Sequence, residues 1–199
     1  MNPLKTITGT LVVGFILAII ISFLSGKQEI ALNTLSLVVW LHVFFGIIWI
    51  GLLYYFNFVQ VPALAEAASD TNGPGGKGIT KYLAPRALLW FRWGAVATWL
   101  TGAIAIELLF GNGKIIDIFF KFSSPVMSIG AWLGTIMLFN VWVFIWPNQK
   151  KVLGIVEATD EEKNKARMVA FYASRTNAIL SIPMILSMVS YGHGGYIFY

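Results

Sequence analysis

The chain has 199 residues, of which 57% are hydrophobic, 15% aromatic and only 12% charged. A soluble domain carries about 25% charged residues, so this composition indicates an integral membrane protein. The absence of cysteine excludes disulfides, thiolate metal sites, iron–sulfur clusters and covalently attached c-type haem. The net charge of +5 does not indicate a nucleic-acid-binding protein, because the basic residues are spread between apolar segments instead of forming one patch.

Five apolar segments are each long enough to supply the roughly 20 residues that cross about 30 Å of hydrocarbon. We therefore predict an all-α protein, an integral membrane bundle of five transmembrane helices that forms a single membrane domain over residues 1–199. The predicted helices cover residues 6–24, 33–61, 87–110, 123–146 and 160–196. We expect the second helix to stop at Pro62, the third to open after Pro85 and the fourth to close at Pro147.

The fifth helix is predicted to begin outside the membrane. Thr159 and Glu162 have the spacing of a capping box, so we expect residues 160–175 to form a water-exposed first half. Pro183 should bend the helix within the membrane, because proline removes one backbone donor. Residues 69–78 combine glycines, a proline and polar turn residues, and this composition predicts a mobile loop.

The basic residues predict the orientation. Five spans place the amino terminus and the segments 62–86 and 147–175 on one side of the membrane. That side holds ten basic residues: Lys5, Lys77, Lys81, Arg86, Lys150, Lys151, Lys163, Lys165, Arg167 and Arg175. The other side holds three: Lys27, Lys114 and Lys121. By the positive-inside rule, we expect a bacterial inner-membrane protein with a cytoplasmic amino terminus and a periplasmic carboxyl terminus.

The only two histidines are the first candidates for a functional site. Ionisable residues inside a span are costly, and so each is a candidate by default. His42 lies roughly 13 Å into the second helix and His193 roughly 9 Å from the end of the fifth, which puts both at a similar depth in the outer leaflet. Two facing imidazoles would hold a b-type haem, or part of a copper site. Alternatively, each histidine only joins neighbouring helices by a hydrogen bond.

The helix around His42 carries further candidates. At 100° per residue, Gly46, Trp49, Asn57 and Gln60 share its face, and Gly46 would leave room for a flat macrocycle. Two other ionisable residues lie within the third helix, Arg92 and Glu107. Long side chains near helix ends can extend to the membrane–water interface, and this explains the presence of both residues without a functional role. Alternatively, Arg92 would bind an anionic group.

Three stretches resemble a known family. They are Trp40-Leu-His42 with Gly46-x-x-Trp49-x-Gly51 and the run from Tyr54 to Pro62; Asn140 to Lys151; and Arg175-Thr-Asn177 through Pro183 to His193. Over residues 33–195 the chain is similar to the membrane domain of the bacterial membrane-bound urate oxidases, in which a cytochrome c domain follows. More loosely, it resembles the haem-binding protoporphyrinogen oxidases and the copper-resistance D proteins.

This resemblance implies an electron-carrying redox protein with haem b, or copper, on His42 and His193. Its partners would be the lipid bilayer and a separate periplasmic cytochrome c. A purine substrate such as urate would need hydrogen bonds from Asn57, Gln60, Arg92 and Asn177. Two alternatives stay open: a non-catalytic subunit of a larger membrane oxidase or respiratory complex, and a copper-binding or copper-transport protein. The sequence does not decide whether the chain is itself an oxidoreductase or whether it forms a homo-oligomer.

Overall fold

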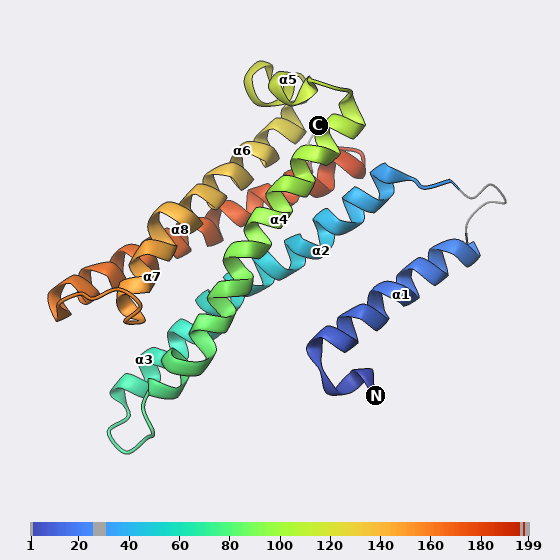
Figure 1. The fold of residues 1–199 in the computed structure, drawn as a ribbon. Helices are drawn as coiled ribbons and strands as arrows, with labels where there is room; N and C mark the ends of the chain where they lie inside the picture. The colour runs from blue at the N-terminus through green and yellow to red at the C-terminus, as the bar shows by residue number, and fades with distance from the viewer. Residues whose placement is uncertain (1, 26–30, 196, 198–199) are drawn as a thin grey trace. The chain divides into compact units, whose positions relative to one another are not determined.

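The computed structural model describes residues 2–25, 31–195 and 197. All regular secondary structure in these residues is helical (Figure 1). Within them, five helical segments are long and apolar enough to cross a membrane: Ile7–Ser25, Thr34–Ser69, Ile79–Phe110, Pro125–Val152 and Asp160–Gly192. The prediction of an all-α chain with five apolar helices is confirmed. Its insertion in a bilayer and its orientation stay predictions.

The chain forms two compact units, Met1–Thr34 and Leu35–Tyr199. The first unit contains a short 3₁₀ turn, η1 (Pro3–Lys5), and helix α1 (Ile7–Ser25), in which no residue is buried. A helix that exposes apolar side chains all round is stable only in apolar surroundings, and a lipid environment meets that need. No finding tests whether the whole chain acts as one domain.

The second unit is a helical bundle. Helix α2 (Thr34–Tyr55), the π-helical turn η2 (Phe56–Gln60) and α3 (Val61–Ser69) form its first segment. The turn η3 (Ile79–Leu83) and α4 (Ala84–Phe110) form the second. After the short α5 (Lys114–Lys121) come α6 (Pro125–Phe139), η4 (Asn140–Ile145) and α7 (Trp146–Val152), and then α8 (Asp160–Gly192). Figure 1 shows α3 and α7 at one end of this unit and α5 at the other.

The helices do not stop at the three prolines where the sequence analysis expected boundaries. Each π-helical turn ends two residues before a proline, and the helix continues through Pro62, Pro85 and Pro147. Proline lacks the backbone N–H, and its ring clashes with the carbonyl of the preceding turn. A wider π-helical turn just before the proline relieves this clash without ending the helix. The Thr159–Glu162 capping box is present as predicted, and α8 runs on through Pro183.

The longer helices extend the bundle beyond the thickness of a membrane. The Thr34–Ser69 segment has 36 residues, which corresponds to about 54 Å at 1.5 Å per residue against about 30 Å of hydrocarbon. At least one end of this segment therefore lies outside the hydrocarbon of any bilayer that it spans upright. The apolar core is centred on Trp49, Leu53, Phe91 and Met137, which are almost fully buried between α2, α4 and α6.

Candidate functional site

His42 lies against α4 near the α5 end of the bundle. Its Nδ1 is 2.8 Å from the carbonyl oxygen of Thr98. The ring rests on Gly102, where an added Cβ would come within 2.9 Å of the ring carbon Cε1. Gly102 therefore permits the close approach of His42, since any larger residue would displace the ring. The side chain itself is half-buried.

The hydrogen bond to Thr98 determines the tautomer of His42. A carbonyl oxygen can only accept, so Nδ1 carries the proton, and in the neutral ring Nε2 keeps its lone pair. This arrangement is usual for histidines that bind a metal through Nε2, because the Nδ1 bond orients the ring. Among the contacts described for His42, none engages Nε2.

His193 lies at the end of α8, where it is exposed and no longer helical. Its Nδ1 is 2.9 Å from the carbonyl oxygen of Val189 on the same helix. If this ring is neutral, the bond to a carbonyl oxygen places its proton on Nδ1, as at His42. No described contact joins this ring to another helix.

The structure does not bring the two histidines together. The end of α8 lies beside the last residue of α4, because the rings of Tyr191 and Phe110 are 5.6 Å apart. The His42 ring lies against Gly102. Residues 102 and 110 of α4 are separated by about 12 Å along the helix axis, at 1.5 Å per residue. No described contact joins the two rings, and the binding of a metal by His42, by His193 or by both stays a prediction.

The glycine and tryptophan predicted beside His42 serve helix packing. An added Cβ on Gly46 would lie 3.8 Å from Cγ2 of Thr98. The side of Gly46 on which the sequence analysis expected a macrocycle is therefore next to α4. Trp49 is 2% exposed and belongs to the core. Its indole nitrogen, like that of Trp142, is buried without a hydrogen-bond partner within the described part of the chain.

A cavity of about 850 Å³ lies at the opposite end of the bundle. It is open on one side and is lined by residues of η2, α3, η3, α4, η4, α7 and α8. Most of the lining is apolar, and Phe56 and Phe91 supply aromatic surfaces with their ring centroids 5.4 Å apart. The polar lining consists of Asn57, Gln60, Thr80, Gln149, Asn164, Arg167 and Ser174. This volume lies in the range of small-molecule sites, about 300–1,000 Å³.

Two of the four polar residues predicted to form a site line this cavity. Asn57 donates from Nδ2 to the carbonyl of Leu53 at 2.8 Å and to Oγ of Ser174 at 2.9 Å. Gln60 is 8% exposed, and its Oε1 is buried without a hydrogen-bond partner among the described residues. A buried acceptor without a partner is costly, so it indicates a ligand or water at this position.

The other two polar residues are engaged elsewhere. Asn177 is fully buried, accepts a hydrogen bond from Asn140 at 2.8 Å and donates one to the carbonyl of Met137 at 2.9 Å. It therefore joins α8 to α6 and η4. The guanidinium of Arg92 lies 3.8 Å from the centroid of the Trp146 ring, a cation–π contact outside the cavity.

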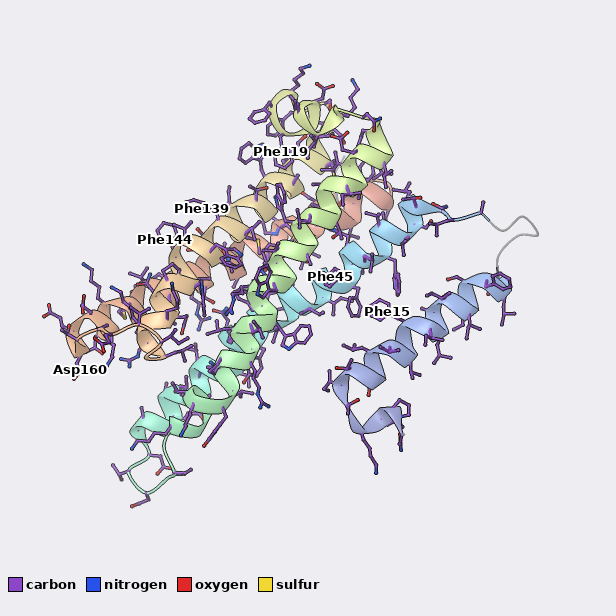
Figure 2. The ribbon with its side chains drawn as sticks, viewed as in Figure 1. Phe15, Phe45, Phe119, Phe139, Phe144 and Asp160 are labelled. Atoms are coloured by element: carbon purple, nitrogen blue, oxygen red, sulfur yellow. The ribbon has the colours of Figure 1, made fainter. Side chains whose placement is uncertain are left out.

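Glu107 has a structural role that the sequence did not indicate. Its carboxylate accepts hydrogen bonds from the backbone N–H groups of Gly113 and Ile115, at the start of α5. At the same end, Asp117 forms ion pairs with Lys114 and Lys121. These two hydrogen-bonded partners lower the pKa of Asp117 to about 2. Figure 2 shows Phe119 of this helix at the end of α6, where its ring is 5.4 Å from that of Trp132.

Sequence reasoning missed Arg167, Gln149 and Ser174 as lining residues. In the sequence, Arg167 is one basic residue among many on the predicted cytoplasmic side, and only its position on α8 brings it to the cavity. Its Nη1 donates to Oδ1 of Asn164 at 2.7 Å. Arg167 and Ser174 are about two helical turns apart, so the sequence places them on one face of α8. Nothing in the sequence indicates that this face borders a cavity.

The second unit is an all-helical bundle whose long helices are apolar enough to span a membrane, and half-buried His42 and a largely apolar cavity lie toward its opposite ends. The family model described as "Urate oxidase N-terminal" matches residues 112–198. The match covers α5 to α8, and so includes Arg167, Asn177 and His193 but neither His42 nor Gln60. It supports the urate oxidase-like resemblance for this part of the chain. No curated protein and no solved structure matches.

Proposed function

We propose that this chain is a membrane redox protein related to the N-terminal domain of urate oxidases, and that it carries electrons through a b-type haem bound to His42. The observation that supports this proposal best is the hydrogen bond from His42 Nδ1 to the carbonyl of Thr98. It holds the ring against α4 and leaves the lone pair on Nε2 for a metal ion. Bound haem would supply one-electron transfer. The protein's own contribution is the orientation of the imidazole by Thr98 and Gly102.

The direction of electron flow follows from the proposed orientation. With the amino terminus in the cytoplasm of a bacterium, the cavity end faces the cytoplasm and the His42 end faces the periplasm. A donor on the cytoplasmic side would then reduce the haem, and a separate periplasmic cytochrome c would accept the electrons. The match to a urate oxidase domain supports this class of reaction, and urate is the first donor to test.

The test is a reduced-minus-oxidised absorbance spectrum of the full chain purified in mild detergent, together with metal analysis. We expect b-type absorbance that His42→Ala abolishes. Because His193 lies at a different level, His193→Ala should retain most of it. Equal loss in both variants would restore the paired site predicted from the sequence. Bound copper without haem would support the copper alternative. Absence of both cofactors, with stoichiometric co-purification of oxidase chains, would support an accessory subunit.

Two glycine variants provide a matched pair. Gly102→Ala places a methyl group 2.9 Å from the His42 ring, whereas an added Cβ on Gly51 meets nothing within 4 Å. Gly102→Ala should therefore shift or weaken the haem absorbance, and Gly51→Ala should leave it unchanged. Identical spectra in the two variants would show that the contact between His42 and α4 does not orient the ligand.

A further inference from the structure

We propose that Arg92 and Lys150 bind the phosphate of an anionic phospholipid, at a site between α4 and α7 around the ring of Trp146. The guanidinium carbon of Arg92 lies 3.8 Å from the centroid of this ring, and Nζ of Lys150 lies 5.9 Å from it. The sum of the two distances, 9.7 Å, is the upper limit for the separation of the charged groups. Since the lysine stem is flexible, one phosphate can accept hydrogen bonds from both. The site is separate from the proposed haem and needs no cofactor.

Neither cation has a carboxylate partner among the described residues. No ion pair described for the chain includes Arg92 or Lys150. The acidic residue of α4 is Glu107, which lies about 22 Å along the helix from Arg92 and caps α5. The segment Pro125–Val152 contains no acidic residue. Because a charge in an apolar segment is costly without a counter-charge, an anionic ligand would stabilise this pair of cations.

The contact with Trp146 leaves the donors of Arg92 available. A cation–π contact uses the face of the planar guanidinium, whereas its five N–H groups point outward in the plane. This fork of N–H groups matches two oxygens of one phosphate, and Lys150 adds a point charge beside it. All three side chains are half-buried, so a ligand can reach them from the surface of the bundle.

The site lies at the level of the lipid phosphates in the proposed membrane. Helix α5 lies at one end of the bundle (Figure 1) and carries ion-paired lysines, which places it outside the hydrocarbon. Measured from that end, Arg92 lies about 27 Å along α4 from Phe110, and Trp146 lies about 32 Å from Pro125, at 1.5 Å per residue. Both distances are close to the thickness of the hydrocarbon, about 30 Å. The two side chains therefore lie at the opposite surface, where the headgroups begin.

The surroundings of the site favour a lipid over a soluble phosphate ester. Leu89, one turn before Arg92, and Trp93, next to it, are exposed on α4. Val143, one turn before Trp146, is exposed on the adjacent helix. Acyl chains would cover these apolar side chains, whereas a soluble ester would leave them uncovered. Basic sites between membrane helices are a known means of holding anionic headgroups.

The experiment is native mass spectrometry of the full chain, delipidated in a neutral detergent and titrated with dioleoyl-phosphatidylglycerol. Dioleoyl-phosphatidylcholine, in which the choline neutralises the phosphate charge, is the comparison lipid. We expect the wild type to bind phosphatidylglycerol about 30-fold more tightly than phosphatidylcholine. A parallel titration contains an excess of glycerol 3-phosphate, which has the phosphate but no acyl chains, and it should leave this preference unchanged.

Neutralising variants locate the site. Arg92→Gln should lower the affinity for phosphatidylglycerol about 10-fold, because it removes the bidentate donor. Lys150→Gln should lower it about 3-fold, because a single point charge is lost. The matched controls are Arg86→Gln and Lys151→Gln, which remove the same charge from the same two helices at positions for which no contact with Trp146 is described. Both controls should keep the wild-type preference.

Three results would overturn the proposal. One is equal binding of the two lipids by the wild type. The second is an equal loss in Arg92→Gln and Arg86→Gln, which would mean that the net charge of the chain selects the lipid. The third is displacement of the lipid by glycerol 3-phosphate, which would assign the site to a soluble ester.

Thermal unfolding midpoints separate a folding defect from loss of the site. If Arg92→Gln unfolds at a lower temperature than the wild type, the comparison of Lys150→Gln with Lys151→Gln decides, because both lysines are half-buried at the surface of α7. A loss of affinity in Lys150→Gln alone would support the site, and an equal loss in both would contradict it.

Discussion

Replacement of Asn177 tests how much a single buried amide contributes to the association of α8 with the rest of the bundle. Asn177 is fully buried and makes two interhelical hydrogen bonds, one from Asn140 Nδ2 and one to the carbonyl of Met137. Asn177→Leu keeps a similar shape but removes both. It also leaves the amide of Asn140 as a buried donor without a partner.

The expected loss of stability can be worked from these contacts. Each hydrogen bond contributes about 1 kcal/mol net in water and about 0.6 kcal/mol on average between membrane helices. A buried polar group left without a partner costs about 1–3 kcal/mol. For the Asn140 amide, part of this cost is already included in the loss of its hydrogen bond to Asn177. We therefore expect Asn177→Leu to lower the free energy of unfolding by about 2–3 kcal/mol.

The assay is reversible unfolding in mixed micelles with increasing SDS, followed by circular dichroism, for the wild type and a double-mutant cycle. Asn140→Leu alone should cost less than Asn177→Leu, because it removes one of the two hydrogen bonds. The double variant leaves no orphaned Asn140 amide and should cost less than the sum of the two single changes. Thr176→Val, at an exposed position one residue earlier in α8, is the matched control.

Two results would refute this reasoning. A change of less than about 0.5 kcal/mol for Asn177→Leu would mean that water or a shifted side chain satisfies Asn140. Strict additivity in the cycle would mean that the two amides do not interact in the folded protein.

Three other predictions concern the two ends of the bundle and one helix contact. The pKa of Asp117 is lowered to about 2 by its lysine partners, so its ion pairs persist below the ordinary value of 3.8 and are lost as the pH falls toward 2. The protection factors of the α5 amides, which correct for the change of intrinsic exchange rate with pH, should fall over that window, and in Asp117→Asn they should not. Gly130→Ala places a Cβ 3.0 Å from the Cβ of Ser187 and should destabilise the contact between α6 and α8 by about 1–3 kcal/mol. The same SDS unfolding measures this loss. An added Cβ on Gly134 meets nothing within 4 Å, so Gly134→Ala should leave the stability unchanged. Ser69→Cys should react with an impermeant maleimide only in inside-out vesicles, and labelling in intact spheroplasts would reverse the proposed orientation.

The sequence alone predicted the five helices, because a span in hydrocarbon must satisfy its own backbone hydrogen bonds and must be apolar over a sufficient length. These are properties of one segment at a time. The capping box at Thr159 and Glu162 was predictable for the same reason, since both of its hydrogen bonds are local. The prolines misled the prediction of helix ends. Their effect depends on whether the preceding turn widens, and π-helical turns before Pro62, Pro85 and Pro147 leave little trace in composition.

The tertiary structure alone assigned the polar residues to their roles. The helix positions of His42 and His193 suggested a shared depth, but the contact of Tyr191 with Phe110 shows that α8 ends at a different level from the His42 ring. Asn57 and Asn177 look equivalent in the sequence, yet one lines a cavity and the other pairs with Asn140. The physical reason is that helix rotation and axial shift are set by packing between segments distant in the chain. A change of one residue in that register moves a side chain by about 100° around its helix, and no local pattern specifies it.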